Sequence, residues 1–482
     1  MTFDELLTLV SSNNAPALCT NSRLVEAGGI FVALEGAACD GHDFIDEALS
    51  KGAKYIVSQK SCRCKDAEVI VVEDSAEAAA ALAQAGRGNP ASRLTNLAVT
   101  GTNGKTTVAF FVRSCIQAAG HKCGLIGTVI YDTGLQTSQA TLTTPDCLTI
   151  AWQQSQMVKA GAKYMIIEAS SHALSQNRLA HIDFKAAAFT NLTGDHLDYH
   201  KTQKEYLAAK AKLFEQLSPR AVAVLNKQSP QAQEIAGATK AKILWYAVDE
   251  QADITAHIES LDINGTVFIL EYAGERQTVK ISLLGWHNVS NSLAAAGLCL
   301  AAGFDLQTIA AGLSALRGVP GRLEKVSCTG HERRVTSHVF VDYAHTDDAL
   351  KNVLTALRPF CVGSLIVVFG CGGDRDKTKR PRMAKVAEEL SDFVIVTSDN
   401  PRTEKPQDII NEIVTGFENP GSPRITVEQD RGKAIELAIK TAGKNDIVLI
   451  AGKGHENYQI IGTQRFDFDD KEIAQEFLRK RK

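Results

Sequence analysis

The feature that most constrains the fold of this chain is the segment T-G-T-N-G-K-T-T at residues 100–107. It follows a short apolar run at 97–100 and precedes a predicted helix from Thr106 to about Ala119. A strand, a glycine-rich turn, Lys-Thr and a helix are together typical of loops whose backbone N–H groups cradle a polyphosphate. Lys105 is predicted to neutralise the β- and γ-phosphate oxygens and Thr106 to bind Mg²⁺, although Val99 stands where the strict motif has glycine. Nucleoside triphosphate binding is therefore expected, and a glycine turn without a ligand is the disfavoured alternative.

The remaining apolar runs predict an α/β protein. Early in the chain, the runs at 30–34 and 55–57 predict strands, the alanine-rich segment 76–85 predicts a helix, and the Gly/Pro-rich stretch 86–90 predicts a linker. Further strand-like runs lie at 164–167, 186–189, 221–225, 339–341, 365–369, 393–396 and 447–450. Short apolar runs separated by helices are typical of parallel sheets covered on both faces. In such sheets, ligands bind beyond the carboxyl ends of the strands.

Composition narrows the class of protein. The chain has 482 residues, a formal net charge of -3 and 44% hydrophobic residues, which is ordinary for two to four globular domains. The near-neutral charge disfavours a protein that coats nucleic acid, and no apolar run reaches the ~18 residues needed to cross a bilayer. The acidic N-terminus is unlike a signal peptide, so a cytoplasmic protein is expected. The 11 cysteines include no pair of C-x-x-C motifs and are predicted to be mainly small buried hydrophobic residues.

Polar residues after the predicted strands indicate the kind of nucleotide enzyme. The segment N-K-Q-S at 226–229 lacks the aspartate that reads guanine, so guanine specificity is disfavoured. Glu168 ends a predicted strand and is either a Mg²⁺ ligand or a surface carboxylate. The segment 190–200 contains two histidines and two aspartates, which suits a divalent metal site. In the helix predicted at 206–214, Lys210 and Lys212 cannot share a face, and on residues alone each is interpreted as a surface lysine.

Taken together, the motifs resemble those of the Mur ligases, the amide ligases that build the peptide stem of peptidoglycan. The resemblance spans essentially the whole chain, and its motifs are specific as a set although each is weak alone. They are G-T-N-G-K-T-T at 101–107, E-A-S-S-H at 168–172, N-L-T-G-D-H-L-D-Y-H at 191–200, A-A-K at 208–210, G-W-H-N at 285–288 with Asn291, P-G-R-L-E at 320–324, D-Y-A-H-T at 342–346, F-G-C-G-G-D-R-D at 369–376, D-N-P-R at 399–402 and A-G-K-G-H-E at 451–456.

The resemblance implies an α/β fold of three domains. These are an N-terminal UDP-binding α/β domain at 1–92, a central P-loop ATPase domain with a mostly parallel sheet at 93–323, and a C-terminal Rossmann-like α/β domain for the amino acid at 324–482. The C-terminal domain is expected to close over ATP, which shields an acyl phosphate from water.

The implied reaction joins meso-2,6-diaminopimelate to the D-Glu γ-carboxylate of UDP-N-acetylmuramoyl-L-Ala-D-Glu. ATP is the implied co-substrate and Mg²⁺ the implied cofactor. The protein is expected to be a monomer that neither binds nucleic acid nor inserts into a membrane. The alternatives are the same reaction with L-lysine, a ligase like folylpolyglutamate synthetase, and a P-loop regulatory or motor ATPase. Folylpolyglutamate synthetases lack the UDP-binding domain and the D-N-P-R motif, and both features are expected here.

The resemblance also implies roles for individual residues in catalysis and ATP binding. Lys105, Glu168, His196 and Lys210 are the implied catalytic residues. The implied metal ligands are Thr106, Glu168, His196 and Lys210, with Lys210 carrying a CO₂-derived carbamate (N6-carboxylysine) that makes it a carboxylate-like ligand. The implied ATP-binding residues are Gly101, Thr102, Asn103, Gly104, Lys105, Thr106, Thr107, Asn288, Asn291, Arg322 and Asp342.

The two remaining substrates have their own implied contacts. For the UDP-N-acetylmuramoyl dipeptide these are Thr20, Ser22, Thr143, Thr144, Ser170, Gln176 and Arg178. For diaminopimelate they are Arg375, Asp399, Asn400, Pro401, Arg402, Gly452 and Glu456. Arg402 is the implied selector of diaminopimelate over lysine, because a guanidinium fork suits the extra carboxylate. The chain departs from the family pattern at Leu142, where asparagine is usual, and at Asp347, where proline is usual.

Overall fold

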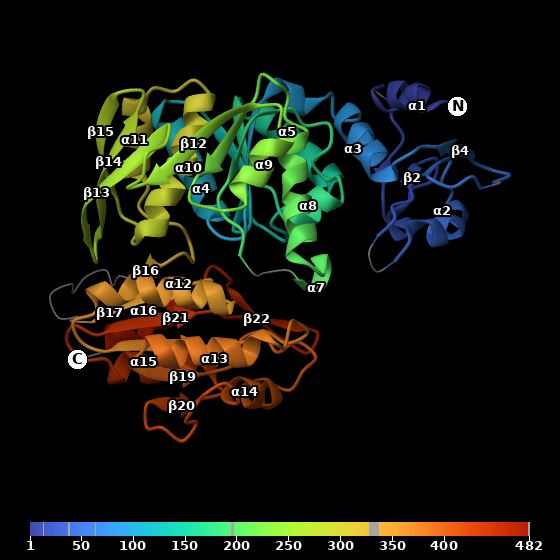
Figure 1. Cartoon of the computed structure of the whole chain (residues 1–482). Coiled ribbons are helices and arrows are strands. Elements are labelled where there is room, and N and C mark those ends of the chain that lie inside the picture. The colour runs from blue at the N-terminus through green and yellow to red at the C-terminus, as the bar shows by residue number, and fades with distance from the viewer. Residues whose placement is uncertain (13, 37–38, 63, 194–196, 327–336, 481–482) are drawn as a thin grey trace.

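The structure is a computed structural model that describes residues 1–482 except 13, 37–38, 63, 194–196, 327–336 and 481–482. Its strands form three main sheets that follow one another along the chain. Figure 1 shows the N-terminal part in blue beside the central part, and the C-terminal part in orange and red beneath the central part. The predicted α/β class and mostly parallel central sheet are confirmed, whereas the domain boundaries at 92 and 323 stay predictions.

The N-terminal sheet is small and wholly parallel, with the order β1-β2-β3-β4. Its elements are α1 (Phe3–Val10), β1 (Leu18–Cys19), β2 (Ile30–Val32), α2 (Ile45–Ser50), β3 (Tyr55–Ser58), β4 (Glu68–Val71) and α3 (Ser75–Ala85). Buried side chains of α1 and α3 cover one face, and those of α2 cover the other. Helix α3 begins where predicted because the Asp74 carboxylate accepts hydrogen bonds from the N–H groups of Ala76 and Glu77.

The central sheet has eleven strands in the order β15-β14-β13-β12-β11-β10-β5-β9-β6-β7-β8. They are β5 (Thr95–Thr100), β6 (Cys123–Ile126), β7 (Ile130–Asp132), β8 (Thr137–Gln139), β9 (Tyr164–Glu168), β10 (Phe184–Phe189), β11 (Val222–Asn226), β12 (Lys242–Val248), β13 (Ile254–Asp262), β14 (Gly265–Tyr272) and β15 (Glu275–Ile281). The helices are α4 (Lys105–Ala118), α5 (Cys147–Lys159), α6 (Ser171–Ser175), α7 (Leu197–His200), α8 (Gln203–Glu215), α9 (Ala232–Ala238), α10 (Trp286–Ala301) and α11 (Leu306–Ala315).

The middle strands of this sheet are apolar throughout because both faces are covered. In β5, Leu97 and Val99 pack against α4, α10 and α11, whereas Ala98 between them packs on the opposite face with α5, α8 and α9. The parallel neighbours β9 and β10 divide their side chains between the same two clusters. These are the strands that the apolar runs predicted.

The two edges of the central sheet differ from the prediction, because antiparallel strands extend it. Strands β13, β14 and β15 pair antiparallel on one side, and β7 and β8 do so on the other. Strand β13 alternates buried with more exposed positions near its start and is largely exposed beyond, and β8 is exposed throughout. A search for fully apolar runs misses such half-exposed strands, since their pattern is alternation.

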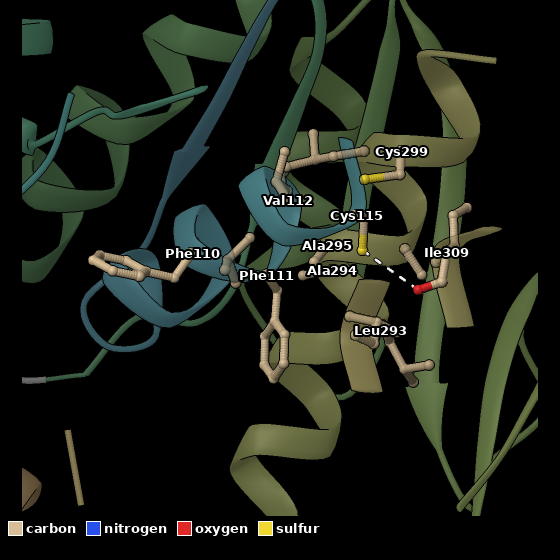
Figure 2. Packing of buried hydrophobic residues seen from close by; sticks show 14 of the residues in the cluster. Phe110, Phe111, Val112, Cys115, Leu293, Ala294, Ala295, Cys299 and Ile309 are labelled. Carbon is tan, nitrogen blue, oxygen red and sulfur yellow. Dashed lines mark hydrogen bonds between the residues drawn. The ribbon is translucent and has the colours of Figure 1, made fainter. Parts of the chain in front are cut away.

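The core behind the glycine-rich loop is packed so tightly that position 312 requires glycine. Figure 2 shows Val112 and Cys115 of α4 near Cys299 of α10 and Ile309 of α11, and the Cys115 thiol lies 3.5 Å from the Ile309 carbonyl oxygen. A Cβ placed on Gly312 would overlap the Cα of Cys115. Helices α4 and α11 therefore approach each other backbone to backbone, which fixes the helix that begins at Lys105.

The C-terminal sheet has the order β16-β17-β21-β18-β19-β20, in which only the β16–β17 pair is antiparallel. Its strands are β16 (Glu324–Lys325), β17 (His338–Asp342), β18 (Leu365–Phe369), β19 (Phe393–Val396), β20 (Ile425–Val427) and β21 (Ile447–Ala451), and a separate hairpin consists of β22 (Tyr458–Ile461) and β23 (Gln464–Asp467). Helices α12 (Asp347–Leu357), α13 (Lys379–Leu390) and α14 (Pro406–Val414) cover one face, and α15 (Arg431–Thr441) and α16 (Asp470–Lys480) cover the other.

The cysteines follow the composition-based prediction in part. Those at 115, 123, 147, 299 and 371 are buried, whereas Cys39 is exposed. Burial raises the pKa of the Cys147 and Cys371 thiols to about 12, so these groups stay protonated at neutral pH. In the part of the chain that the structure describes, no helix has both the length and the apolar character that a membrane crossing requires.

Candidate active site

The glycine-rich loop lies at the carboxyl edge of the central sheet, between β5 and α4, and its glycines are sterically required. Gly101 and Gly104 have φ angles of 146° and 90°, which disfavour residues with a side chain. A Cβ on Gly101 would overlap the Thr190 hydroxyl, and one on Gly104 would overlap the Asn291 amide oxygen. The loop is therefore held between the segment after β10 and helix α10.

Two lysines converge on this loop from different helices. Lys105 Nζ donates to the carbonyl oxygens of Gly101 at 2.8 Å and Thr102 at 2.7 Å. Lys210 Nζ, on α8, donates to the same Gly101 oxygen at 2.9 Å and lies 4.3 Å from the centroid of the Tyr206 ring. Lys210 is 1% exposed, so its interpretation as a surface lysine was wrong. Lys212, two positions on, is exposed as predicted.

Glu168 is fully buried, so the surface-carboxylate alternative for this residue was wrong. Its Oε2 accepts hydrogen bonds from the Thr106 hydroxyl at 3.0 Å and the Thr128 hydroxyl at 2.9 Å, and its Oε1 accepts one from the Thr128 N–H at 2.9 Å. Arg322 Nη2 lies 3.2 Å from the Thr106 hydroxyl oxygen. The structure thus places a hydroxyl, a carboxylate and a guanidinium beside the start of α4.

This donor set fits Mg²⁺, which takes oxygen ligands and shares them with phosphates. Thr106 and Glu168 supply a hydroxyl and a carboxylate within hydrogen-bonding distance of each other. Lys210, as an ammonium group, has no lone pair to offer a metal and could serve as an oxygen ligand only after modification. His196, the remaining predicted metal ligand, lies outside the described residues.

The segment after β10 is part of the site through its contacts with the loop. The Thr190 hydroxyl donates to the Asn103 carbonyl at 2.6 Å, and Asn191 Oδ1 accepts from the Asn103 N–H at 3.0 Å. Farther along, His200 is buried, with Nε2 2.9 Å from the Ser171 hydroxyl oxygen. The sequence indicated a site at 190–200, and the structure adds that its first residues brace the glycine-rich loop.

Two of the predicted ATP-binding residues, Asn288 and Asn291, are buried at the start of α10. Asn288 Nδ2 donates to the Leu284 carbonyl at 2.7 Å, and Asn291 Nδ2 donates to Asn288 Oδ1 at 3.1 Å. Since Asn291 also faces Gly104, this pair lies against the glycine-rich loop. The predicted Thr107 is buried in the first turn of α4.

Asp342 and Arg322 lie where the central and C-terminal parts meet. The Asp342 carboxylate accepts hydrogen bonds from the N–H groups of Leu323 at 2.6 Å and Ala344 at 2.8 Å. Burial raises the pKa of Asp342, while Arg322 and these two N–H groups act in the opposite direction. The Arg322 guanidinium carbon lies 4.9 Å from the centroid of the Tyr343 ring. Asp342 therefore fixes the backbone that carries Arg322.

Most predicted dipeptide contacts form one hydrogen-bonded group at the end of β9. Arg178 binds both the Thr144 carbonyl at 2.7 Å and the Gln176 amide oxygen at 2.7 Å, and the Thr144 hydroxyl accepts from the Ser170 N–H at 3.0 Å. The Thr143 hydroxyl lies 3.1 Å from that of Thr128. These residues therefore adjoin the carboxylate of Glu168 through Thr128.

Thr20 and Ser22 lie apart from that group, in the N-terminal part directly after β1. Ser22 is buried, and its hydroxyl donates to Glu47 at 2.6 Å, which lowers the pKa of that carboxyl. The N-terminal part is tied to the central part by the hydrogen bond of 2.7 Å from Asn177 to Asp74. An extended substrate would be needed to reach both groups.

The predicted diaminopimelate residues gather at the carboxyl edge of the C-terminal sheet. Asn400 Nδ2 donates to Glu456 Oε2 at 2.8 Å, and Lys453 Nζ donates to Asn400 Oδ1 at 3.0 Å and Glu456 Oε2 at 3.3 Å. Burial alone would raise the pKa of Asp399, but Lys453, at 3.8 Å, and Arg431 hold it below its usual value. Gly452 has a φ of 119° and leaves no room for a Cβ beside Asp399.

Lys453 was missed by the sequence analysis although it is fully buried among these residues. The sequence did contain a signal for Lys453, because the polar segment A-G-K-G-H-E comes at the end of the buried strand β21. Arg380 was missed as well. It is fully buried and pairs with Glu404 at 2.8 Å and Glu412 at 2.7 Å, and it donates to the Gly372 carbonyl at 3.3 Å.

Arg402 and Arg375 approach the same loop after β18. Arg402 Nη1 donates to the Gly373 carbonyl at 2.8 Å, and a Cβ on Gly372 would lie 2.9 Å from this nitrogen. Arg375 is exposed and donates to the Asp374 carbonyl at 3.2 Å. Pro401, between Asn400 and Arg402, is buried. The structure thus brings Arg402 next to the network of Asn400, Lys453 and Glu456.

Comparison with known proteins shows that the chain belongs to the Mur ligase family. Residues 17–87 match the description "Mur ligase family, catalytic domain", residues 99–299 match "Mur ligase middle domain", and residues 321–454 match "Mur ligase, glutamate ligase domain". A relative from Gloeobacter violaceus, named UDP-N-acetylmuramoyl-L-alanyl-D-glutamate--2,6-diaminopimelate ligase, is 44% identical over 100% of this chain and 99% of its own length.

Solved structures agree with this assignment. One titled "Structure of UDP-N-acetylmuramoyl-L-alanyl-D-glutamate--2, 6-diaminopimelate ligase" is 33% identical, with a TM-score of 0.68 and coverage of 100% of this chain and 99% of that one. MurF ligase from Thermotoga maritima, solved in complex with ADP, covers 99% of this chain and 100% of its own, with 21% identity and a TM-score of 0.63. At 21% identity, the likeness to the MurF ligase shows a shared fold and nothing more.

Proposed function

We propose that this chain joins meso-2,6-diaminopimelate to the D-Glu γ-carboxylate of UDP-N-acetylmuramoyl-L-Ala-D-Glu at the expense of ATP, in peptidoglycan precursor synthesis. The full-length likeness to the Gloeobacter violaceus ligase of that name supports the reaction. The observation that carries the proposal is that Glu168 and Arg322 both contact Thr106 beside the glycine-rich loop. The C-terminal part adds a hydrogen-bonded cluster of Asn400, Lys453 and Glu456.

The chemistry requires activation of the acid, because a carboxylate is a poor electrophile. The γ-carboxylate oxygen attacks the γ-phosphorus of ATP, and ADP leaves. The amine of diaminopimelate then attacks the carbonyl carbon of the acyl phosphate, phosphate leaves with one of the original carboxylate oxygens, and the nitrogen loses a proton. The first step brings two anions together, so positive charge must be concentrated there. Lys105 and Arg322, which both lie beside Thr106, supply it.

Mg²⁺, held by Thr106, Glu168, His196 and the carbamate of Lys210, would neutralise phosphate charge as ATP binds. The burial of Lys210 supports its proposed modification, since the amine lies in a polar, enclosed position rather than in solvent. Carbamate formation is addition of the neutral amine to CO₂ with loss of one proton. It converts a cation beside Gly101 into an anion of similar reach.

Selection of diaminopimelate over lysine is assigned to Arg402. The two amino acids differ by one carboxylate, and a guanidinium recognises a carboxylate with two parallel hydrogen bonds. Arg402 follows Asn400 by two residues, and Asn400 donates to Glu456, which is proposed to receive the distal ammonium group. Asn400 and Lys453 both bind Glu456 Oε2, which orients its carboxylate for the substrate.

The proposed function is tested by a ligation assay with UDP-N-acetylmuramoyl dipeptide, ATP and Mg²⁺, run in parallel with diaminopimelate and with L-lysine. Product mass and phosphate release are measured together. We expect the diaminopimelate adduct, with one phosphate released per adduct. A lysine adduct formed in preference would reassign the amino acid, and phosphate release indifferent to both substrates would favour a regulatory or motor ATPase.

A further inference from the structure

The C-terminal hairpin β22–β23 contacts both halves of the proposed site. It forms its own two-stranded sheet, in which Tyr458 pairs with Asp467 and Ile460 pairs with Arg465. One strand lies against the motif at 399–402, and the other reaches the edge of the central sheet.

Strand β22 holds the backbone of the motif that carries Arg402. The Ile460 N–H donates to Asn400 Oδ1 at 3.0 Å, and the Ile460 carbonyl accepts from the Arg402 N–H at 3.1 Å. The Arg402 carbonyl in turn accepts from the Gly462 N–H at 2.7 Å. Arg402 has a φ of 51°, an unfavourable conformation for a residue with a side chain, so these bonds are needed to hold it.

Strand β23 and the residue before β22 bind the central part through one cluster of side chains. Arg465 Nη2 donates to Gln139 Oε1 at 3.1 Å, and Gln139 Nε2 donates to Asn457 Oδ1 at 3.0 Å. The Arg465 guanidinium carbon lies 3.8 Å from the centroid of the Tyr458 ring. Because the guanidinium of Arg465 both stacks on a ring and donates a hydrogen bond to an amide oxygen, its position and its orientation are both restrained.

Gln139 links the hairpin to the predicted dipeptide-binding residues. It is the last residue of strand β8, and Thr143 and Thr144 follow it closely in the chain. The hydroxyl of Thr143 lies 3.1 Å from that of Thr128, and Thr128 donates to Glu168. The hairpin therefore joins the edge that carries the acid and phosphate chemistry to the loop that carries Arg402.

We infer that Arg465 is a positioning residue for the amino acid: it fixes the hairpin against β8 and, through β22, the backbone of Arg402. Arg465 acts on diaminopimelate binding without touching the substrate, and this inference rests on the proposed function. A role confined to stability would change the unfolding temperature and leave substrate constants in place. A positioning role changes KM for one substrate selectively.

The test is steady-state kinetics on the full chain with Arg465→Ala, Gln139→Ala and the double variant. We expect Arg465→Ala to raise KM for diaminopimelate about three- to tenfold, since exposed stacking and polar contacts each contribute modestly. KM for ATP and for the UDP substrate should stay within about twofold, and kcat should change less than KM. Gln139→Ala should raise the same KM less, and the double variant should match Arg465→Ala, because the two residues share one contact.

A matched control is Arg276→Ala, which removes an exposed arginine from strand β15, where it pairs with Glu271 away from the site. This variant should leave all three KM values unchanged. An unchanged KM for diaminopimelate in Arg465→Ala, or an equal rise for all three substrates, overturns the inference. If Arg465→Ala does not fold, Gln139→Ala decides alone, since Gln139 is exposed on an edge strand. Absence of any diaminopimelate turnover by the unmodified chain counts against the proposed function instead.

Discussion

The central and C-terminal parts both place lysines at the carboxyl edge of a parallel sheet, and these lysines contact different kinds of partner. Lys105 and Lys210 donate to backbone carbonyls, and they share the oxygen of Gly101 at 2.8 and 2.9 Å. Lys453 donates instead to the side-chain oxygens of Asn400 and Glu456 and lies 3.8 Å from Asp399.

This difference indicates which kind of charged group each edge is suited to bind. Lys105 brings a positive charge to the glycine-rich loop, which favours the binding of a polyphosphate. Lys453 lies beside the carboxylates of Asp399 and Glu456, and Arg431 also acts on Asp399, so this edge carries charges of both signs. We therefore propose that the first edge binds an anion and the second a zwitterion.

The largest effect is expected from removal of the cation in the glycine-rich loop. Lys105→Ala should lower kcat about 10³-fold, because it removes one of the two cations, with Arg322, that are proposed to stabilise the γ-phosphate as it is transferred. The loss should appear with both amino acids and at saturating diaminopimelate. Single-turnover phosphate release measures it, with the unfolding temperature as the control for folding. A loss restricted to KM for diaminopimelate would break the assignment of this edge to ATP.

At the other edge, the effect should be confined to one substrate. Arg402→Ala should lower kcat/KM for diaminopimelate by a factor that corresponds to about 2–4 kcal/mol. The reason is that one carboxylate of the substrate loses its charged partner. KM for ATP should not change. Steady-state kinetics with each substrate varied in turn makes the measurement, and an unchanged KM for diaminopimelate would remove Arg402 from the pocket.

Lys210 and Lys212 offer a matched pair two residues apart on α8. Lys210→Ala should lower turnover about 10²-fold, since it removes the proposed carbamate ligand and a buried contact to Gly101. Lys212→Ala should stay within about twofold, because Lys212 is exposed. Intact-mass and ¹³CO₂-labelled NMR measurements check the modification itself. A carbamate signal that persists in Lys210→Ala would place the modification elsewhere.

A smaller effect is expected in the pH dependence of stability. Burial, together with Arg322, lowers the pKa of His455 to about 4, below its unfolded value of about 6.5. Between these values the unfolded chain binds more protons, so folding stability should fall as pH decreases from about 6.5 towards 4.

His455→Gln removes this titration, so the unmodified chain should lose about 1–2 kcal/mol relative to the variant on going from pH 7 to pH 5. Paired thermal unfolding curves at the two pH values measure the difference. A difference between the two proteins that stays constant with pH would show that His455 titrates normally.

The sequence predicted the parts of the fold that depend on short, contiguous stretches of residues. The strands on either side of the glycine-rich loop are apolar on both faces, and the loop itself is a contiguous motif, so both could be recognised without coordinates. The partly exposed edge strands β13 to β15 carry alternating patterns and were not recognised.

The buried cations could not be predicted from the residues alone, because their partners are distant in the chain. Lys210 meets Gly101 across 109 positions, and Lys453 meets Asn400 across 53. Without the resemblance that singled out Lys210, nothing in the local sequence distinguishes it from Lys212, and the fold shows that Lys210 contacts the loop.

The central claim is that the acid is activated by transfer of the γ-phosphoryl group to its own oxygen. The direct measurement uses UDP-N-acetylmuramoyl-L-Ala-D-Glu labelled with ¹⁸O in the γ-carboxylate, ligated to diaminopimelate, with the released phosphate examined by mass spectrometry. The account predicts one ¹⁸O atom in each phosphate formed with an amide bond. Phosphate that carries no label while the amide product accumulates would contradict it.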